Sequence, residues 1–173
     1  MPPNCFNEDG ALEEAERVVL ALYDALQWRD AVTVQQILAP DLEWWFHGPP
    51  SHQFLMRLLT GSPSAAVDTF QFVPHSVTSF GSTVLSEGCD PTGSITWVHA
   101  WTVSDGIITQ VKEYFNTSLT VTRIGESSNS TRASSPLDSA GIAPRQVRKC
   151  SSVWESSLSN RGGKSVPGLV LAL

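Results

Sequence analysis

One stretch of twenty residues decides the fold: Trp97-Val98-His99-Ala100-Trp101-Thr102-Val103-Ser104-Asp105-Gly106-Ile107-Ile108-Thr109-Gln110-Val111-Lys112-Glu113-Tyr114-Phe115-Asn116. Large and small side chains alternate before the Asp-Gly pair, which is typical of a strand entering a tight hairpin. The odd positions place Trp97, His99 and Trp101 on one face of that strand. Two indoles around an imidazole are typical of a cavity wall, and equally of a helix-covered core that contains one hydrogen-bonded histidine.

The register of this hairpin decides which side chain lies beside His99. A two-residue turn at Asp105-Gly106 places Lys112 opposite His99 and Tyr114 on the face of the two indoles. A three-residue loop shifts the pairing by one residue and places Glu113 on that face instead. Only the second register supplies a His–carboxylate pair for general acid–base catalysis. The Asp-Gly pair favours the two-residue turn and so the less reactive pocket.

Three helices are predicted before the main run of strands. Apolar residues at helical spacing from Leu12 to Leu26 predict a long amphipathic helix, and Asp30 can cap a short second helix. An aromatic strand is predicted over residues 42–47, followed by a third helix that Ser51 can cap. Helices followed by antiparallel strands predict an α+β fold in which the helices cover one face of the sheet.

Composition excludes several classes of protein. The chain has 173 residues, 41% of them hydrophobic, and a net charge of −6, which suits one domain and disfavours a nucleic-acid partner. We find no apolar run long enough for a membrane span, and the three cysteines are isolated. We expect no secretory signal, because residues 1–5 include neither a basic start nor an apolar stretch. We therefore expect a cytoplasmic protein, with the nucleus as a second location. We expect no cofactor and no metal, because the histidines lack the spacing of metal ligands.

The composition changes along the chain and predicts three parts. Residues 1–124 carry the helices and strands and form the predicted domain. Residues 125–152 are Ser-rich and lack aromatic side chains, so we predict a disordered linker. Residues 153–173 are apolar again and form a predicted docking segment, which binds either the domain's own surface or a partner.

Several aromatic stretches resemble the plant wound-induced protein 1 family, also described as senescence-associated. They are residues 44–49, 80–82 and 97–101, together with the C-terminal residues 154–159 and 165–169. The hairpin and its Glu113-Tyr114-Phe115-Asn116 ending resemble the nuclear transport factor 2-like (SnoaL-like) superfamily. This resemblance implies a cone-shaped α+β fold, with three N-terminal helices packed on a curved antiparallel sheet. Superfamily members include isomerases, cyclases and non-catalytic binding proteins, so the fold does not fix the function.

The expected site is an aromatic cavity that binds an apolar small molecule. The predicted ligand-binding residues are Tyr23, Trp45, His47, Phe54, Trp97, His99, Trp101 and Tyr114. No catalytic residue is assigned, because the motif that commonly ends in Asp ends here in Asn116. The outer sheet face is expected to be apolar enough for a homodimer, through Val98, Ala100, Thr102, Thr109, Val111 and Phe115.

Three functions are compatible with these features. The first is a non-catalytic stress, wound or senescence protein that binds an apolar metabolite or assists a metabolic enzyme through protein contacts. The second is an isomerase or cyclase of specialised metabolism that uses His99 with Glu113 or His47. The third is an adaptor that acts through the C-terminal segment.

Overall fold

The computed structural model describes residues 8–61, 70–124, 151–159 and 165–173. Its helices are α1 (Glu8–Trp28), α2 (Ala31–Ile37) and α3 (Phe54–Thr60), with a short 3₁₀ turn at Pro50–His52. The strands are β1 (Leu38–His47), β2 (Pro74–Phe80), β3 (Thr83–Cys89), β4 (Thr96–Ser104), β5 (Ile107–Phe115), β6 (Ser118–Arg123), β7 (Ser151–Glu155) and β8 (Gly168–Ala172). None of the described helices is long and apolar enough to cross a membrane.

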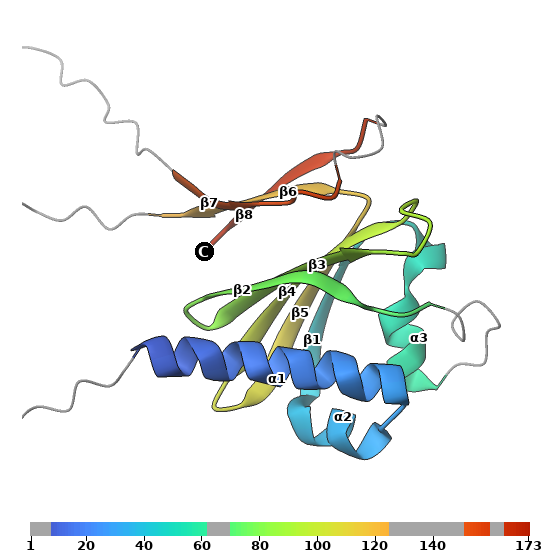
Figure 1. Ribbon diagram of the computed structural model, residues 1–173, viewed down its shortest axis with the longest axis vertical. Coiled ribbons are helices and arrows are strands. Elements are labelled where there is room, and N and C mark those ends of the chain that lie inside the picture. The colour runs from blue at the N-terminus through green and yellow to red at the C-terminus, as the bar shows by residue number, and fades with distance from the viewer. Residues whose placement is uncertain (1–7, 62–69, 125–150, 160–164) are drawn as a thin grey trace, which may run out of the picture.

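Two sheets and a helical layer make up the described part of the chain (Figure 1). The larger sheet has the strand order β1-β5-β4-β3-β2, and the smaller sheet has the order β7-β6-β8. Helix α1 lies on one side of the larger sheet, and the smaller sheet lies on the other side (Figure 1). The expected α+β class with three helices is confirmed. The larger sheet is mixed, however, because β1 runs parallel to β5 while its other pairings are antiparallel.

Local signals set the helix boundaries. Val19, Leu22 and Tyr23 form the buried face of α1, as their helical spacing predicts. The Asp30 carboxylate caps α2 by accepting the backbone N–H of Thr33 at 3.1 Å, as expected. The predicted Ser51 cap is wrong, because Pro50 starts a 3₁₀ turn that delays α3 until Phe54.

The hairpin between β4 and β5 combines the expected turn with the unexpected register. Ser104 pairs with Ile107 across a two-residue turn, and both Asp105 and Gly106 have positive φ angles, as a type I′ turn requires. The register then shifts between Thr102 and Val103, because Thr109 is an extra residue on β5. This bulge places Glu113, not Lys112, opposite His99, so the prediction of the less reactive pocket is wrong.

The C-terminal strands cover the outer face of the larger sheet. On that face Leu85, Val98, Ala100 and Tyr114 are buried with Leu119 and Val121 of β6, and the partly buried Trp154 of β7 and Leu171 of β8 pack against them. The expected dimer face is therefore covered within the chain at Val98 and Ala100. Val111 and Phe115, which were expected on that face, belong instead to the core beneath the helices, because the bulge reverses their orientation. The predicted linker lies almost wholly in residues 125–150, outside the described residues.

Candidate functional site

The inner face of the larger sheet carries a dense group of rings, called here the inner aromatic cluster. Strands β4 and β5 provide its floor, and α1, α3, β1 and residues 70–72 close it. Its rings are Tyr23, Trp44, Phe46, His52, Phe54, Phe70, Phe72, Trp97, His99, Trp101 and Phe115. Trp97 is 1% exposed and Trp101 is fully buried, so both indoles point into the protein.

A hydrogen-bond network runs through this cluster and is called here the buried network. The Tyr23 hydroxyl lies 2.6 Å from both Ser86 Oγ and His99 Nδ1, and it accepts the Trp101 indole N–H at 2.9 Å. The other ring nitrogen of His99 lies 2.8 Å from Glu113 Oε2. Trp44 donates its indole N–H to Glu113 Oε1 at 2.5 Å and completes the network.

One proton arrangement satisfies every member of the buried network. Burial raises the pKa of the Tyr23 phenol far above its usual value, so the phenol keeps its proton and can donate it to His99 Nδ1. His99 Nε2–H then donates to Glu113 Oε2, and Ser86 and Trp101 donate to the Tyr23 oxygen. The network is therefore closed on itself. A substrate would have to displace one of its members to reach His99 or Glu113.

Trp97 stands apart from this network. Its indole nitrogen is buried and has no hydrogen-bond partner among the described residues. The indole fits only because residue 88 is glycine: a Cβ there would lie 2.4 Å from Trp97 Cζ2. Among the described residues, the Trp97 indole N–H is thus a buried donor without a partner, which is unusual in a native core.

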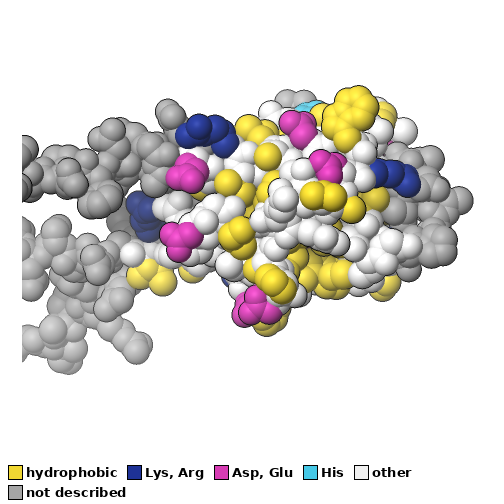
Figure 2. All heavy atoms as spheres, turned by 90° about the horizontal axis from the view of Figure 1, so that it is seen from below, with side chains coloured by type: hydrophobic (Ala, Val, Ile, Leu, Met, Phe, Trp, Pro, Cys, Tyr) yellow, Lys and Arg dark blue, Asp and Glu magenta, His cyan; other side chains and the backbone are white. Residues whose placement is uncertain are grey.

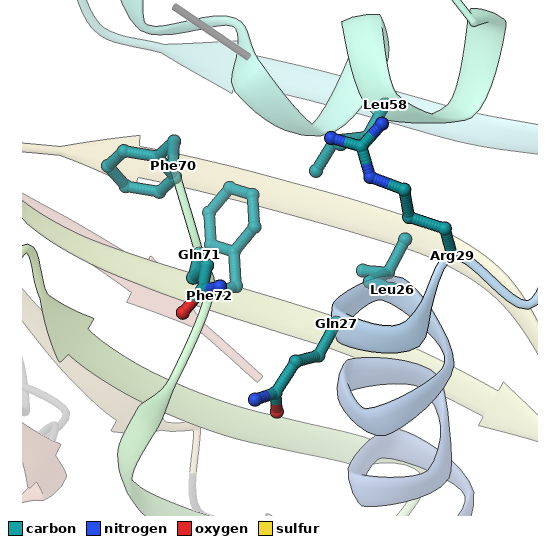
Figure 3. A pocket seen from close by; sticks show the side chains of 7 residues that line it. All are labelled: Leu26, Gln27, Arg29, Leu58, Phe70, Gln71 and Phe72. Atoms are coloured by element: carbon teal, nitrogen blue, oxygen red, sulfur yellow. The ribbon is translucent and has the colours of Figure 1, made fainter. Parts of the chain in front are cut away.

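A small pocket opens beside the cluster (Figure 3). It lies between the end of α1, helix α3 and residues 70–72, and its volume is about 40 Å³. That space suits a few water molecules, whereas small-molecule sites usually measure roughly 300–1,000 Å³. Its lining residues are Leu26, Gln27, Arg29, Leu58, Phe70, Gln71 and Phe72. Phe72 separates the pocket from His99 and Trp97, whose ring centroids lie 5.0 Å and 5.2 Å from its own.

The helical side of the molecule offers a more open groove. It is lined by Glu14, Arg17, Val18, Ala21 and Ile37 and measures about 320 Å³. Figure 2 shows this side, where hydrophobic side chains are interspersed with charged and other polar groups. The groove lies on the outside of α1, away from the buried network. No group of three or more His, Cys, Asp or Glu side chains suited to a metal ion occurs among the described residues.

Five of the eight predicted site residues lie together on the inner face: Tyr23, Phe54, Trp97, His99 and Trp101. The other three lie elsewhere. Trp45 is 56% exposed, and His47 stacks on Tyr114 with their ring centroids 4.9 Å apart. Tyr114 is buried on the outer face of the larger sheet. Alternate residues of a strand face opposite sides, so Trp45 and His47 leave the inner face to Trp44 and Phe46. His47 and His99 therefore share no pocket.

Sequence reasoning missed several inner residues. Trp44 was passed over because the sequence does not show which of two adjacent tryptophans faces inward. Ser86 carries no distinguishing signal, since a serine in a strand is common on either face. Phe72 lies in an irregular segment whose side-chain directions follow no period. Glu113 was identified only in the less favoured register.

A model of the wound-induced protein WI12 family matches residues 56–173. The chain belongs to this family. It is 61% identical to Senescence associated gene 20 of Arabidopsis thaliana and 58% identical to Wound-induced protein 1 of Solanum tuberosum, in each case over 118 residues. Each match covers 68% of this chain and 100% of the relative. The family match includes His99 and Glu113, whereas Tyr23 and Trp44 precede it.

The described part of the chain has an α+β fold with three helices and a mixed, largely antiparallel larger sheet. Among solved structures, the chain is similar to an NTF2-like protein of Burkholderia xenovorans, with 23% identity and a TM-score of 0.45 over 60% of this chain and 90% of that protein. It is also similar to an LEH-like epoxide hydrolase of M. tuberculosis, with 25% identity and a TM-score of 0.46 over 61% of this chain and 84% of that protein. The resemblance to the wound-induced family, inferred from the aromatic stretches, is confirmed by the family match and by the two plant relatives.

Proposed function

We propose that this WI12-family chain acts in plant wound and senescence responses as a non-catalytic protein that binds an apolar small molecule at its inner aromatic cluster. The observation that carries this proposal is the buried network set among aromatic rings. Polar groups are expensive to bury, and the buried network places six of them beside large apolar surfaces. Such surroundings combine hydrophobic contact area with a few oriented polar groups, as small-molecule sites do.

The closed state of the network favours binding over chemistry. A general acid or base needs to lie within hydrogen-bond distance of the group whose proton it transfers. Both ring nitrogens of His99 are engaged by protein atoms, and His99 and Glu113 are fully buried. Neither residue lines the pocket of Figure 3, whereas Phe72 does, and its ring contacts that of His99. The network is therefore better suited to fix the shape and polarity of a site than to shuttle protons.

Native mass spectrometry of the chain isolated from plant tissue tests this proposal. We expect a retained species heavier than the chain alone, which is lost when the protein is unfolded. Replacing Phe72 by Ala should change the amount retained, whereas Trp45→Ala, on the opposite face, should not. A chain that carries no small molecule, and that binds none from an extract of its tissue, would contradict the proposal.

The 2.8 Å contact between His99 Nε2 and Glu113 Oε2 favours a second candidate, an isomerase or cyclase. In that function Glu113 would orient the imidazole and His99 would transfer the proton. Turnover of a cyclisable substrate should then follow a pH–rate profile that is lost in His99→Gln. Equal turnover by that variant, with the fold intact, would remove this candidate.

A further inference from the structure

The unpaired indole of Trp97 indicates what kind of molecule the inner face would take. Trp44 and Trp101 also lie in the inner aromatic cluster, and each donates its indole N–H to a protein oxygen. Trp97 is 1% exposed, yet its Nε1 has no partner among the described residues. Folded proteins rarely leave a buried donor without an acceptor, so this donor calls for an acceptor that the described residues do not supply.

The Trp97 side chain is held in place. Its six-membered ring lies over Gly88, where any Cβ would come within 2.4 Å of Cζ2. Its indole also packs against Tyr23 and Phe72, with ring centroids 5.7 Å and 5.2 Å away. A donor fixed on three sides loses little conformational entropy when an acceptor binds it.

Phe72 lies between this donor and the outside. One side of its ring lines the pocket of Figure 3, and its ring also contacts Trp97 and His99. Residues 70–73 have no regular secondary structure, and Gln71 and Val73 are exposed. Phe72 belongs to no helix or strand, and its ring separates the pocket from the rings of Trp97 and His99.

We propose that the inner face binds a neutral, planar aromatic carbonyl compound, which enters past Phe72 and accepts a hydrogen bond from Trp97 Nε1 through its carbonyl oxygen. This inference rests on the proposed binding function. The surrounding rings favour a planar aromatic body. The unpaired N–H requires an acceptor, and the Glu113 carboxylate next to the neighbouring His99 disfavours an anion.

Two probes of nearly equal shape test the acceptor. 2-Acetylnaphthalene carries a carbonyl group, and 2-isopropenylnaphthalene carries a carbon–carbon double bond at the same place. Each is added to the full-length ¹⁵N-labelled chain, and the six tryptophan indole N–H signals are followed by NMR. We expect the ketone to move the Trp97 signal downfield and to bind roughly 2- to 10-fold more tightly than the alkene, as one neutral hydrogen bond allows. 2-Naphthoate should bind more weakly than the ketone.

Trp97→Phe assigns the signal and should reduce ketone affinity to that of the alkene, while the exposed Trp28→Phe changes neither affinity. Phe72→Ala should strengthen the binding of both probes, because it opens the path to the cluster. Ketone binding that leaves the Trp97 signal unmoved would overturn this inference and leave the proposed function standing. An unchanged Trp97 signal together with no binding of any probe, in wild type and in Phe72→Ala, would overturn both. If Trp97→Phe does not fold, the ratio of ketone to alkene affinity in the wild-type chain, which needs no signal assignment, decides the matter.

Discussion

The two faces of the larger sheet each bury one carboxylate, and they do so differently. On the inner face, Glu113 is hydrogen-bonded by His99 and Trp44, two side chains from distant parts of the sequence. On the outer face, Glu87 is 3% exposed and accepts both the backbone N–H and the hydroxyl of Ser157, at 3.1 Å and 2.6 Å. The inner carboxylate thus belongs to a network inside the core, whereas the outer carboxylate fastens the C-terminal segment to the domain.

This comparison teaches that burial alone does not mark a functional group. Glu87, which holds the C-terminal segment in place, accepts both of its hydrogen bonds from one residue of that segment, Ser157. A carboxylate that orients a histidine within an aromatic cluster has the arrangement that a binding or catalytic site needs. We therefore assign the candidate site to the inner face and a structural role to the outer one.

The largest expected effect follows from removing Glu113. Glu113→Ala leaves His99 and Trp44 without their acceptor in a buried environment, and we expect a loss of about 3–5 kcal/mol in the free energy of unfolding. Urea denaturation measures it. The exposed Glu43→Ala, which removes only a contact to Gln110, is the matched control and should change little. Equal effects of the two variants would show that the buried network does not stabilise the core.

Gly88→Ala tests the packing of Trp97. The added methyl would lie 2.4 Å from the indole, so the side chain has to shift, and we expect a loss of about 1–3 kcal/mol. Gly168→Ala is the control, because its Cβ would meet no atom closer than 3.9 Å. Thermal unfolding followed by circular dichroism compares the two variants. An unchanged Gly88→Ala protein would mean that Trp97 is free to move.

The outer carboxylate should give a smaller and more local effect. Ser157→Ala removes one hydrogen bond to Glu87 but keeps the backbone N–H, so we expect a loss of about 0.5–1.5 kcal/mol. Hydrogen exchange should accelerate in residues 151–159 and remain unchanged in β4 and β5. Acceleration across the whole sheet would indicate that the C-terminal segment is part of the central folding unit.

The smallest expected effect concerns pH. Burial lowers the pKa of His52, so this histidine takes up a proton more readily in the unfolded chain than in the folded one. The contribution of His52 to stability is therefore fully present at pH values above its pKa in the unfolded chain. It is lost as the pH falls through the lower pKa that His52 has in the folded chain. His52→Phe should therefore reduce the drop in melting temperature between pH about 7.5 and about 5.5. An unchanged drop would assign the pH dependence to other groups.

The sequence by itself determined the order of the elements from α1 to β5 and much of the site, whereas it predicted one long strand over residues 107–124 where the structure has β5 and β6 in two sheets. Helical spacing fixed the buried face of α1, Asp105-Gly106 fixed the two-residue turn, and strict alternation placed Trp97, His99 and Trp101 on one face. These features depend on residues close together in the chain, where backbone geometry leaves few choices.

Tertiary structure alone decided the rest. The bulge at Thr109 reversed the face of Glu113 and Tyr114, which the turn residues do not encode. The parallel pairing of β1 with β5 turned Trp44, and not Trp45, toward the inner face. The packing of α1 on the sheet brought Tyr23 into hydrogen-bond distance of His99, 76 positions away in the sequence. Each of these outcomes results from packing between segments far apart in the sequence, so no local pattern of residues specifies it.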